Sequence, residues 1–325
     1  MKLLWRFASL LLLAALGLHA GAALAQSYPS RPIRIVVPYP AGGSIDTTAR
    51  LISPKMADAL NQAVLVENRP GGGARIGEDA VAKAAPDGYT MLIDTASLAI
   101  SPALYRKLPF DAAKDFIPVT RLVATTLILA VNPKLPAASI RELIALAKSS
   151  PGGLNHGHTG LGTSLHMAMA LLKLSTGIDF LGIPYKGDGL VSNALIAGEV
   201  DVAIVTLPSS LTLIKAGRMR ALGVSSASRS ALLPDVPTIA EAGVTGYEYG
   251  AWQGLYLPAK TPRDIVELIQ REAVKALNMP DVRDRVLALG LEPVGSTQEE
   301  ADARYKADLA KFARIVREAR IPLQD

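Results

Sequence analysis

Cysteine is absent from the 325-residue chain. Its absence excludes disulfides, thiolate metal ligands, a thiol nucleophile and a lipid-modified N-terminal cysteine. The sequence also lacks a G-x-S-x-G nucleophile elbow, an H-E-x-x-H pair and a Walker A loop. The nearest approach to an elbow runs from Gly162 to His166 and ends in histidine where glycine is required. We therefore predict a protein that is not an enzyme and that uses no cofactor.

Long apolar runs are confined to the N-terminus. Lys2 and Arg6 provide a basic start, residues 8–18 are apolar, and Ala23-Leu24-Ala25 precedes Gln26. This pattern predicts a secretory signal peptide, residues 1–25, cleaved after Ala25. An uncleaved membrane anchor is the alternative, disfavoured by the short apolar run and the small residues at the cleavage site. We expect a soluble protein exported to a bacterial periplasm.

The charge balance is modest. The chain has 34 basic and 29 acidic residues, a formal charge of +5, and removing Lys2 and Arg6 with the signal leaves +3. Scattered charge of this size does not predict nucleic-acid binding. It suits an anionic small ligand, although net charge alone is weak support.

Strand-length apolar segments alternate with helix-length amphipathic segments from Arg31 onward, the pattern of an α/β fold with parallel sheets. The run 117–131 is too long for one ordinary strand and is expected to pass between two domains. We predict one lobe from residues 26–122 with 247–325, and a second from residues 123–246. The chain would then cross twice between the lobes, and two such connections form a hinge. We expect the ligand in the crevice between the lobes, at the carboxyl ends of the strands.

Two glycine-rich loops each stand between a predicted strand and a predicted helix. Such turns expose backbone N–H groups at a helix start, where the macrodipole favours negative charge. We predict that they bind one carboxylate from opposite sides; a plain helix cap is the alternative. Asp46 would repel an anion, so we expect it to cap the helix or bind water. The loop residues proposed to contact the ligand are Tyr39, Ala41, Gly42, Gly43 and Ser44 in the first loop, and Thr159, Gly160, Gly162, Thr163 and Ser164 in the second.

Three histidines accompany the second loop: His156, His158 and His166. A polar role in the ligand pocket is the favoured interpretation for His158 and His166, because a neutral imidazole can donate to a carboxylate. Structural packing and a three-histidine metal site are the alternatives. We predict no metal.

Arg75 and Asp94 are further candidates at predicted strand ends. Arg75 follows Gly71-Gly72-Gly73, whose spacing fits a dinucleotide loop poorly. Its guanidinium can contact an anion, or it can be an ordinary solvated side chain. Asp94 can hold a ligand amine or hydroxyl, although a turn or cap is its more ordinary role.

Colinear motifs along the mature chain resemble the Bug family of periplasmic solute receptors, the TctC-type component of tripartite tricarboxylate transporters. The matching stretches are Tyr28-Pro29-Ser30-Arg31-Pro32-Ile33, the loop from Pro38 to Asp46, Val66-Glu67-Asn68-Arg69-Pro70-Gly71, residues 82–90, Pro184-Tyr185-Lys186-Gly187 and Leu233-Pro234-Asp235-Val236-Pro237-Thr238. The resemblance implies a two-lobed Venus-flytrap fold, similar to type II periplasmic binding proteins. It also implies that the two loops grip a ligand carboxylate, partly through water.

The resemblance further implies a monomer that captures a small organic acid for two membrane subunits of a transporter. A periplasmic sensor with a signalling partner such as a sensor kinase is the alternative, and a histidine-based metal-binding protein or hydrolase is a third. The chain departs from the family at His156, His158, Arg75 and Thr206, where an aspartate is commoner at the last position. These changes predict a more positive pocket. We therefore expect a ligand with several negative groups, or an aromatic acid stacked on histidine or Trp252, and not a cationic or zwitterionic amino acid.

Overall fold

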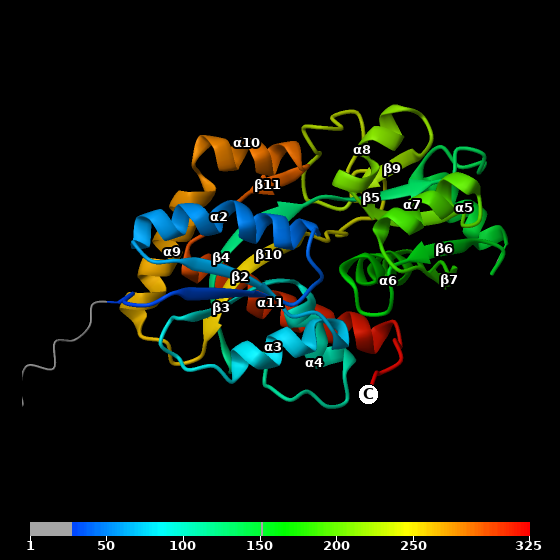
Figure 1. Cartoon of the computed structure of the whole chain (residues 1–325). Helices are drawn as coiled ribbons and strands as arrows, with labels where there is room; N and C mark the ends of the chain where they lie inside the picture. The colour runs from blue at the N-terminus through cyan, green and yellow to red at the C-terminus, as the bar shows by residue number, and fades with distance from the viewer. Residues whose placement is uncertain (1–27, 151) are drawn as a thin grey trace, which may run out of the picture.

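The computed structural model describes residues 28–150 and 152–325, and it contains two β-sheets with helices on both faces of each (Figure 1). The predicted signal peptide lies outside the described residues. Within the described part of the chain, none of the helices combines the length and the apolar character needed to cross a membrane. The fold is mixed α/β with two lobes.

The first sheet has the strand order β11-β4-β10-β3-β1-β2. β1, β2 and β3 are parallel, whereas β10 is antiparallel to both of its neighbours. The sheet is therefore mixed and not parallel as predicted, because β10 enters it from the second lobe in the opposite direction. Its strands are β1 (Ile33–Val37), β2 (Val64–Asn68), β3 (Thr90–Thr95), β4 (Phe116–Thr125), β10 (Ala251–Pro258) and β11 (Leu291–Pro293).

Helices cover this sheet on both sides (Figure 1). In α2 (Ser44–Leu60), the buried side chains Ile45, Ile52 and Met56 recur on one face and enter a core shared with β1 and α9. Burying each such side chain contributes about 1.5–3 kcal/mol. The other helices of this lobe are α3 (Arg75–Ala82), which follows a short 3₁₀ turn (Gly72–Ala74), α4 (Ser97–Leu104), α9 (Arg263–Leu277), α10 (Pro280–Ala288) and α11 (Gln298–Glu318).

The second sheet has the strand order β7-β6-β8-β5-β9. β6, β7 and β8 are parallel, and β5 is antiparallel to β8 and β9. Its strands are β5 (Leu127–Val131), β6 (Asn155–His158), β7 (Leu181–Pro184), β8 (Val202–Thr206) and β9 (Arg220–Val224). Its helices are α5 (Ile140–Ser149), α6 (Ser164–Thr176), α7 (Asp188–Ala197) and α8 (Leu207–Lys215).

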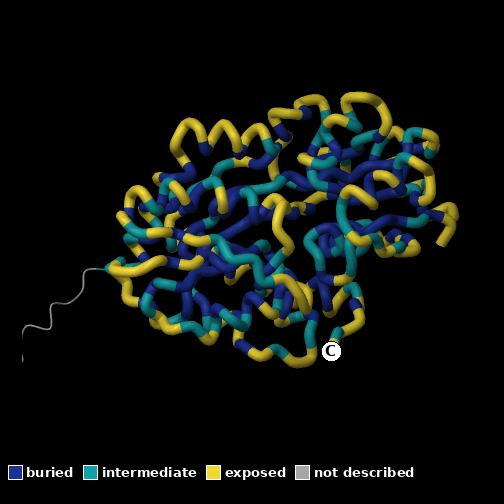
Figure 2. The backbone as a smooth tube through the Cα atoms, viewed as in Figure 1, coloured by how far each residue is buried: buried dark blue, intermediate teal, exposed yellow. Residues whose placement is uncertain are grey.

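The chain crosses between the sheets twice. On the outgoing path only Thr126 separates β4 from β5, and on the return path residues 225–250 join β9 to β10. The predicted lobe limits stay a prediction, with β4 remaining in the first sheet as far as Thr125. Buried segments run through both lobes (Figure 2), and one apolar cluster joins Leu104 of α4 to Leu165 of α6.

Two helices have no counterpart in the sequence prediction, α4 and α8, and each directly continues a buried strand. Thr261, which precedes α9, does not cap that helix. Its hydroxyl donates to the carbonyl of Pro258, and Pro262 occupies the N-cap position.

Candidate functional site

A cavity of about 260 Å³ lies between the lobes, at the carboxyl ends of β1, β3 and β6. The first lobe contributes residues of the β1–α2 loop, the 3₁₀ turn, the end of β3 and α4. The second contributes the loop between β6 and α6. The lining residues are Tyr39, Gly73, Thr95, Ser97, Ile100, Ser101, Leu104, Tyr105, Leu161, Gly162, Thr163 and Ser164.

Four of the predicted ligand contacts therefore line one cavity: Tyr39, Gly162, Thr163 and Ser164. The remaining first-loop candidates, Ala41 to Ser44, come two residues after Tyr39 and are exposed. Thr159 and Gly160 precede the lining residues of the second loop, and the Thr159 hydroxyl donates to Thr163 Oγ1 over 3.0 Å. The structure thus brings parts of both predicted loops to the same inter-lobe space.

Three of the glycine amides are not free, which corrects the prediction that they are available to an anion. Gly42 N–H donates to the Asp46 carboxylate over 2.9 Å, so Asp46 closes the first loop. Gly160 N–H donates to Nδ1 of His158 over 3.1 Å, and Gly162 N–H donates to Nδ1 of His166 over 3.4 Å. These glycines shape the loops but do not offer their own donors.

The amides one step further along the chain are available. Gly43 and Thr163 are the N-caps of α2 and α6, and Ser44 and Ser164 are the first helical residues. Among the described residues, none accepts a hydrogen bond from these four amides. Two helix N-termini from different lobes thus retain donors, where the helix dipole favours a negative group.

Hydroxyl groups backed by a buried carboxylate form the first-lobe wall of the cavity. Asp94, at the end of β3, is fully buried. Its Oδ1 accepts from the Tyr39 hydroxyl over 3.0 Å and from the Ser97 hydroxyl over 2.8 Å. The two hydroxyl oxygens also lie 2.7 Å from each other. Their two protons are therefore used within the cluster of Tyr39, Ser97 and Asp94, and oxygen lone pairs are left for a ligand. Asp94 therefore acts behind the cavity wall, and it is not itself a lining residue.

A second carboxyl group, Glu78 of α3, interacts with Asp94 inside the first lobe, and it too is fully buried. Burial and the charge of Asp94 raise the pKa of Glu78 well above its ordinary value. Burial also raises the pKa of Asp94. Both Glu78 oxygens and Asp94 Oδ2 lack a hydrogen-bond donor within the described residues. A proton shared by the two carboxyls accounts for Asp94 Oδ2 and one Glu78 oxygen, since two buried neighbours cannot both ionise without a large cost.

The three histidines form a row beside α6. The ring centroids of His156 and His158 are 5.4 Å apart, and those of His158 and His166 are 5.3 Å apart. Burial, the neighbouring rings and Lys173 lower the pKa of His156 to about 3 and that of His166 to about 4. Burial also lowers the pKa of His158. The rings stay neutral at physiological pH, and among the residues that the structure describes no cluster suited to a metal ion occurs.

Neither Arg75 nor Trp252 is a lining residue of the cavity, although Arg75 stacks on Tyr105, which is one. The Arg75 guanidinium donates to the carbonyls of Gly72 and Asp325 and lies over the Tyr105 ring. The Trp252 indole is 2% exposed and donates to Asp308 Oδ2 over 2.7 Å, so no ligand can stack on it.

Thr206 is also absent from the cavity lining. Although the family more often has aspartate at this position, a threonine here does not leave the end of β8 without a negative charge. The Thr206 amide and hydroxyl both donate to Asp188 Oδ2, over 3.2 and 2.6 Å. Asp188 begins α7 and places a carboxylate beside the end of β8. The Arg75 guanidinium is bound to backbone carbonyls, and His158 is neutral. The cavity therefore lacks the positive charge that the sequence suggested.

The sequence prediction missed Ser97, Ile100, Ser101 and Leu104, because it did not include α4, and it also missed Thr95 at the end of β3. One available signal was the polar run that follows the buried strand, Asp94-Thr95-Ala96-Ser97. Polar residues directly after a buried strand in an α/β fold stand at the edge where ligands bind.

Comparison with known proteins gives close relatives over nearly the whole chain. A UPF0065 protein from the tcbD-tcbE intergenic region of Pseudomonas sp. strain P51 is 39% identical over 296 residues, 91% of this chain and 88% of the relative. Protein BugT of Bordetella pertussis is 37% identical, over 90% of this chain and 91% of its own.

Solved structures agree. R. palustris Rpa4515 with adipate has a TM-score of 0.79 at 33% identity, over 91% of this chain and 100% of its own. MatC from Rhodopseudomonas palustris with bound malate has a TM-score of 0.76 at 31% identity, over 89% of this chain and 100% of its own. Residues 48–321 match the family model described as the tripartite tricarboxylate transporter family receptor, TctC. The chain therefore belongs to the TctC family of solute-binding receptors.

Proposed function

We propose that this protein captures a small organic carboxylate between its lobes and delivers it to the membrane subunits of a tripartite tricarboxylate-type transporter. One observation carries the proposal: the inter-lobe cavity has free helix-start amides on one side and a row of hydroxyls on the other. The amides of Thr163 and Ser164 have no acceptor within the described residues, and both residues line the cavity. Hydrogen bonds to a carboxylate from such donors contribute about 1.5–3 kcal/mol each.

The family and the solved neighbours support this assignment. The matching model is that of a transporter receptor, and two neighbours were solved with the dicarboxylates adipate and malate. Because the cavity is built from both lobes, a ligand that contacts both walls favours the closed arrangement and shifts the hinge equilibrium. Export through the predicted signal peptide would place the receptor in the periplasm.

The first-lobe wall favours a ligand with a hydroxyl or another donor beside its acid group. The protons of Tyr39 and Ser97 are used within their cluster with Asp94, so the two hydroxyls present acceptor oxygens. A second carboxylate against these oxygens would meet lone pairs and no donor. This adds a hydroxyl preference to the ligand with several negative groups, or the aromatic acid, that the sequence suggests.

Matched ligands separate the two parts of the proposal. We would titrate purified protein with L-malate, succinate, adipate and benzoate by calorimetry. Malate and succinate differ by one hydroxyl, and a net hydrogen bond of about 1 kcal/mol corresponds to about fivefold tighter binding of malate. Equal affinity for the pair would contradict the hydroxyl preference. Absence of binding by every acid would contradict the receptor assignment itself.

A further inference from the structure

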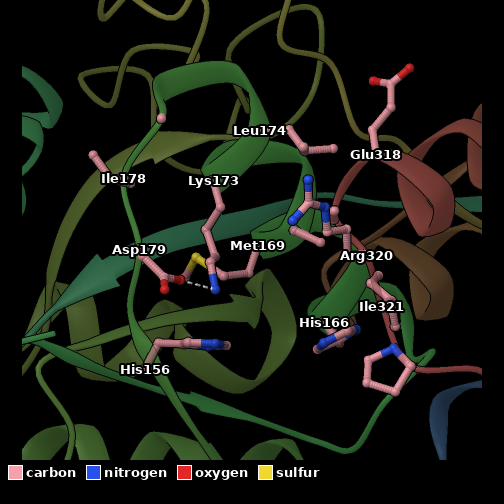
Figure 3. A pocket seen from close by; sticks show the side chains of 14 residues that line it. His156, His166, Met169, Lys173, Leu174, Ile178, Asp179, Glu318, Arg320 and Ile321 are labelled. Carbon is pink, nitrogen blue, oxygen red and sulfur yellow. Dashed lines mark ion pairs between the residues drawn. The ribbon is translucent and has the colours of Figure 1, made fainter. Parts of the chain in front are cut away.

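Buried acidic side chains in this protein generally have a basic partner. Within the described residues, arginine side chains pair with the carboxylates of Asp46, Glu272 and Asp308. Even the exposed Asp179, which lines a pocket of about 480 Å³ beside α6, forms an ion pair with Lys173 (Figure 3). Glu78 and Asp94 differ, because both are fully buried and neither forms an ion pair within residues 28–150 and 152–325.

The carboxyl groups of Glu78 and Asp94 have unequal hydrogen-bond surroundings. Three donors lie near Asp94 Oδ1: the Thr95 amide at 2.6 Å, the Ser97 hydroxyl at 2.8 Å and the Tyr39 hydroxyl at 3.0 Å. Neither Glu78 oxygen has a donor among the described residues. Hydrogen bonds to a carboxylate stabilise its charged form. The shared proton is therefore more stable on Glu78, and the negative charge on Asp94.

The other ionisable groups near Glu78 do not reverse this order. Burial and the charge of Asp94 raise the pKa of Glu78 and outweigh the lowering by Arg75. The Arg75 guanidinium donates to two backbone carbonyls and not to Glu78. Three tyrosines also lie near Glu78, and burial raises the pKa of each, so they stay neutral: Tyr39, Tyr256 and Tyr305.

The position of the charge affects the cavity because Asp94 backs its wall. Tyr39 and Ser97 line the cavity and bond to Asp94, whereas Glu78 is not a lining residue. A charged carboxylate oxygen is a stronger acceptor than a neutral one, so it holds the hydroxyl protons more firmly within the cluster. A ligand hydroxyl can then donate to the two hydroxyl oxygens, whereas a second ligand carboxylate meets a like charge.

We propose that Glu78 is a positioning residue of the inter-lobe site. Its proton, donated to Asp94 Oδ2, keeps the negative charge on Asp94. The first-lobe wall thereby becomes an acceptor that selects hydroxy acids over the corresponding acids without a hydroxyl. This inference rests on the proposed receptor function and names the residue that sets its ligand class.

Two isosteric variants test where the charge must lie. The Glu78–Asp94 pair carries one negative charge in the parent protein, in Glu78→Gln and in Asp94→Asn. In Glu78→Gln the amide group donates to Asp94, and the charge stays at the wall. In Asp94→Asn the amide group donates to Glu78, so Tyr39 and Ser97 face a neutral oxygen.

Calorimetry with L-malate and succinate measures the effect. One net hydrogen bond corresponds to an about fivefold preference for malate, which the parent protein and Glu78→Gln should share. In Asp94→Asn we expect the two acids to bind equally. Glu78→Met removes the donor to Asp94 with little change in size, so it should also lose the preference that Glu78→Gln retains. Urea unfolding checks that each variant is folded.

Infrared spectroscopy locates the proton without any ligand. A protonated carboxylic acid has a C=O stretch at higher frequency than carboxylates and amides, and carbon-13 in the side-chain carboxyl lowers that frequency. At neutral pH we expect such a band in the parent protein. It should shift in cell-free protein labelled at glutamate and stay in place in protein labelled at aspartate. Glu78→Gln and Asp94→Asn should both lack it.

The proposal would be overturned by a band that shifts with labelled aspartate, or by no such band in the parent protein. Equal affinity of the parent protein for the two acids would also overturn it. So would any other order of preference among the variants, such as one kept by Asp94→Asn and lost in Glu78→Gln. If no acid binds, the receptor function fails, while the infrared spectra still decide where the proton lies. The two failures are therefore distinguishable.

Discussion

The contact between Gly162 and Leu104 is the most direct link between lobe closure and ligand affinity. Gly162 belongs to the second-lobe loop and has a φ of +77°. A Cβ atom placed there would lie 2.1 Å from Leu104 Cδ2 of α4 and 3.9 Å from Ile100 Cγ2. Gly162→Ala therefore cannot be accommodated unless the lobes separate or Leu104 moves.

Two costs can be separated in Gly162→Ala. The left-handed backbone costs an alanine about 1–2 kcal/mol whether or not the lobes are closed, so this part lowers the unfolding free energy. The overpacking costs about 1–3 kcal/mol, and it arises only when the loop meets α4. Because a ligand that contacts both lobes needs that arrangement, we expect affinity to fall by about 5- to 150-fold.

Calorimetry with L-malate and urea unfolding measure the two costs. Gly217→Ala is the matched control, since Gly217 has a φ of +68° and no atom within 4 Å of the added Cβ. It should lose stability and keep its affinity. The double variant Gly162→Ala/Leu104→Ala should recover part of the lost affinity, because it removes the obstructing methyl groups. Unchanged affinity in Gly162→Ala would refute the idea that this contact accompanies ligand capture.

Three further outcomes are expected. A raised folded-state pKa means that Glu78 binds its proton more tightly in the folded than in the unfolded protein, so stability falls as pH rises above about 4.3. Glu78→Gln removes this ionisable group, so it should raise the free energy of unfolding at pH 7 and have no such effect near pH 4. An equal gain at both pH values in urea unfolding would disprove this expectation. Trp252→Phe should lower the free energy of unfolding by about 1–3 kcal/mol, because the hydrogen bond to Asp308 is lost. Malate affinity should not change. Weaker malate binding in calorimetry would show that Trp252 belongs to the ligand site after all. Asp188→Asn should lower the unfolding free energy by about 1–3 kcal/mol, because it weakens the hydrogen bonds at the end of β8, and unaltered urea unfolding would show these bonds to be unimportant.

Local sequence signals predicted most strands and helices, because hydrophobic periodicity and glycine turns act over a few residues. The sequence pattern predicts a strand over residues 33–37 and a helix over residues 44–61, and the structure contains β1 at Ile33–Val37 and α2 at Ser44–Leu60. β10 shows the limit of such signals. Its residues are apolar as expected, yet its antiparallel direction depends on where the chain returns from the second lobe.

The candidate site was partly predictable for the same reason. Both loops were found from their glycines, but the partners of the loop amides depend on side-chain geometry that spacing does not encode. The Asp46 carboxylate folds back on Gly42, and His158 folds back on Gly160. Arg75 and Trp252 were misplaced because a residue type suited to binding says nothing about which way its side chain points.

The one-residue junction at Thr126 has a mechanical consequence. Thr126 is buried, its carbonyl accepts from the Leu207 amide, and its hydroxyl bonds to Glu292 over 3.2 Å. With β4 and β5 anchored in separate sheets on either side, a pulling force cannot lengthen this junction without stripping a strand from one of them. The molecule should accordingly yield to stretching in one concerted rupture instead of extending gradually between two intact halves.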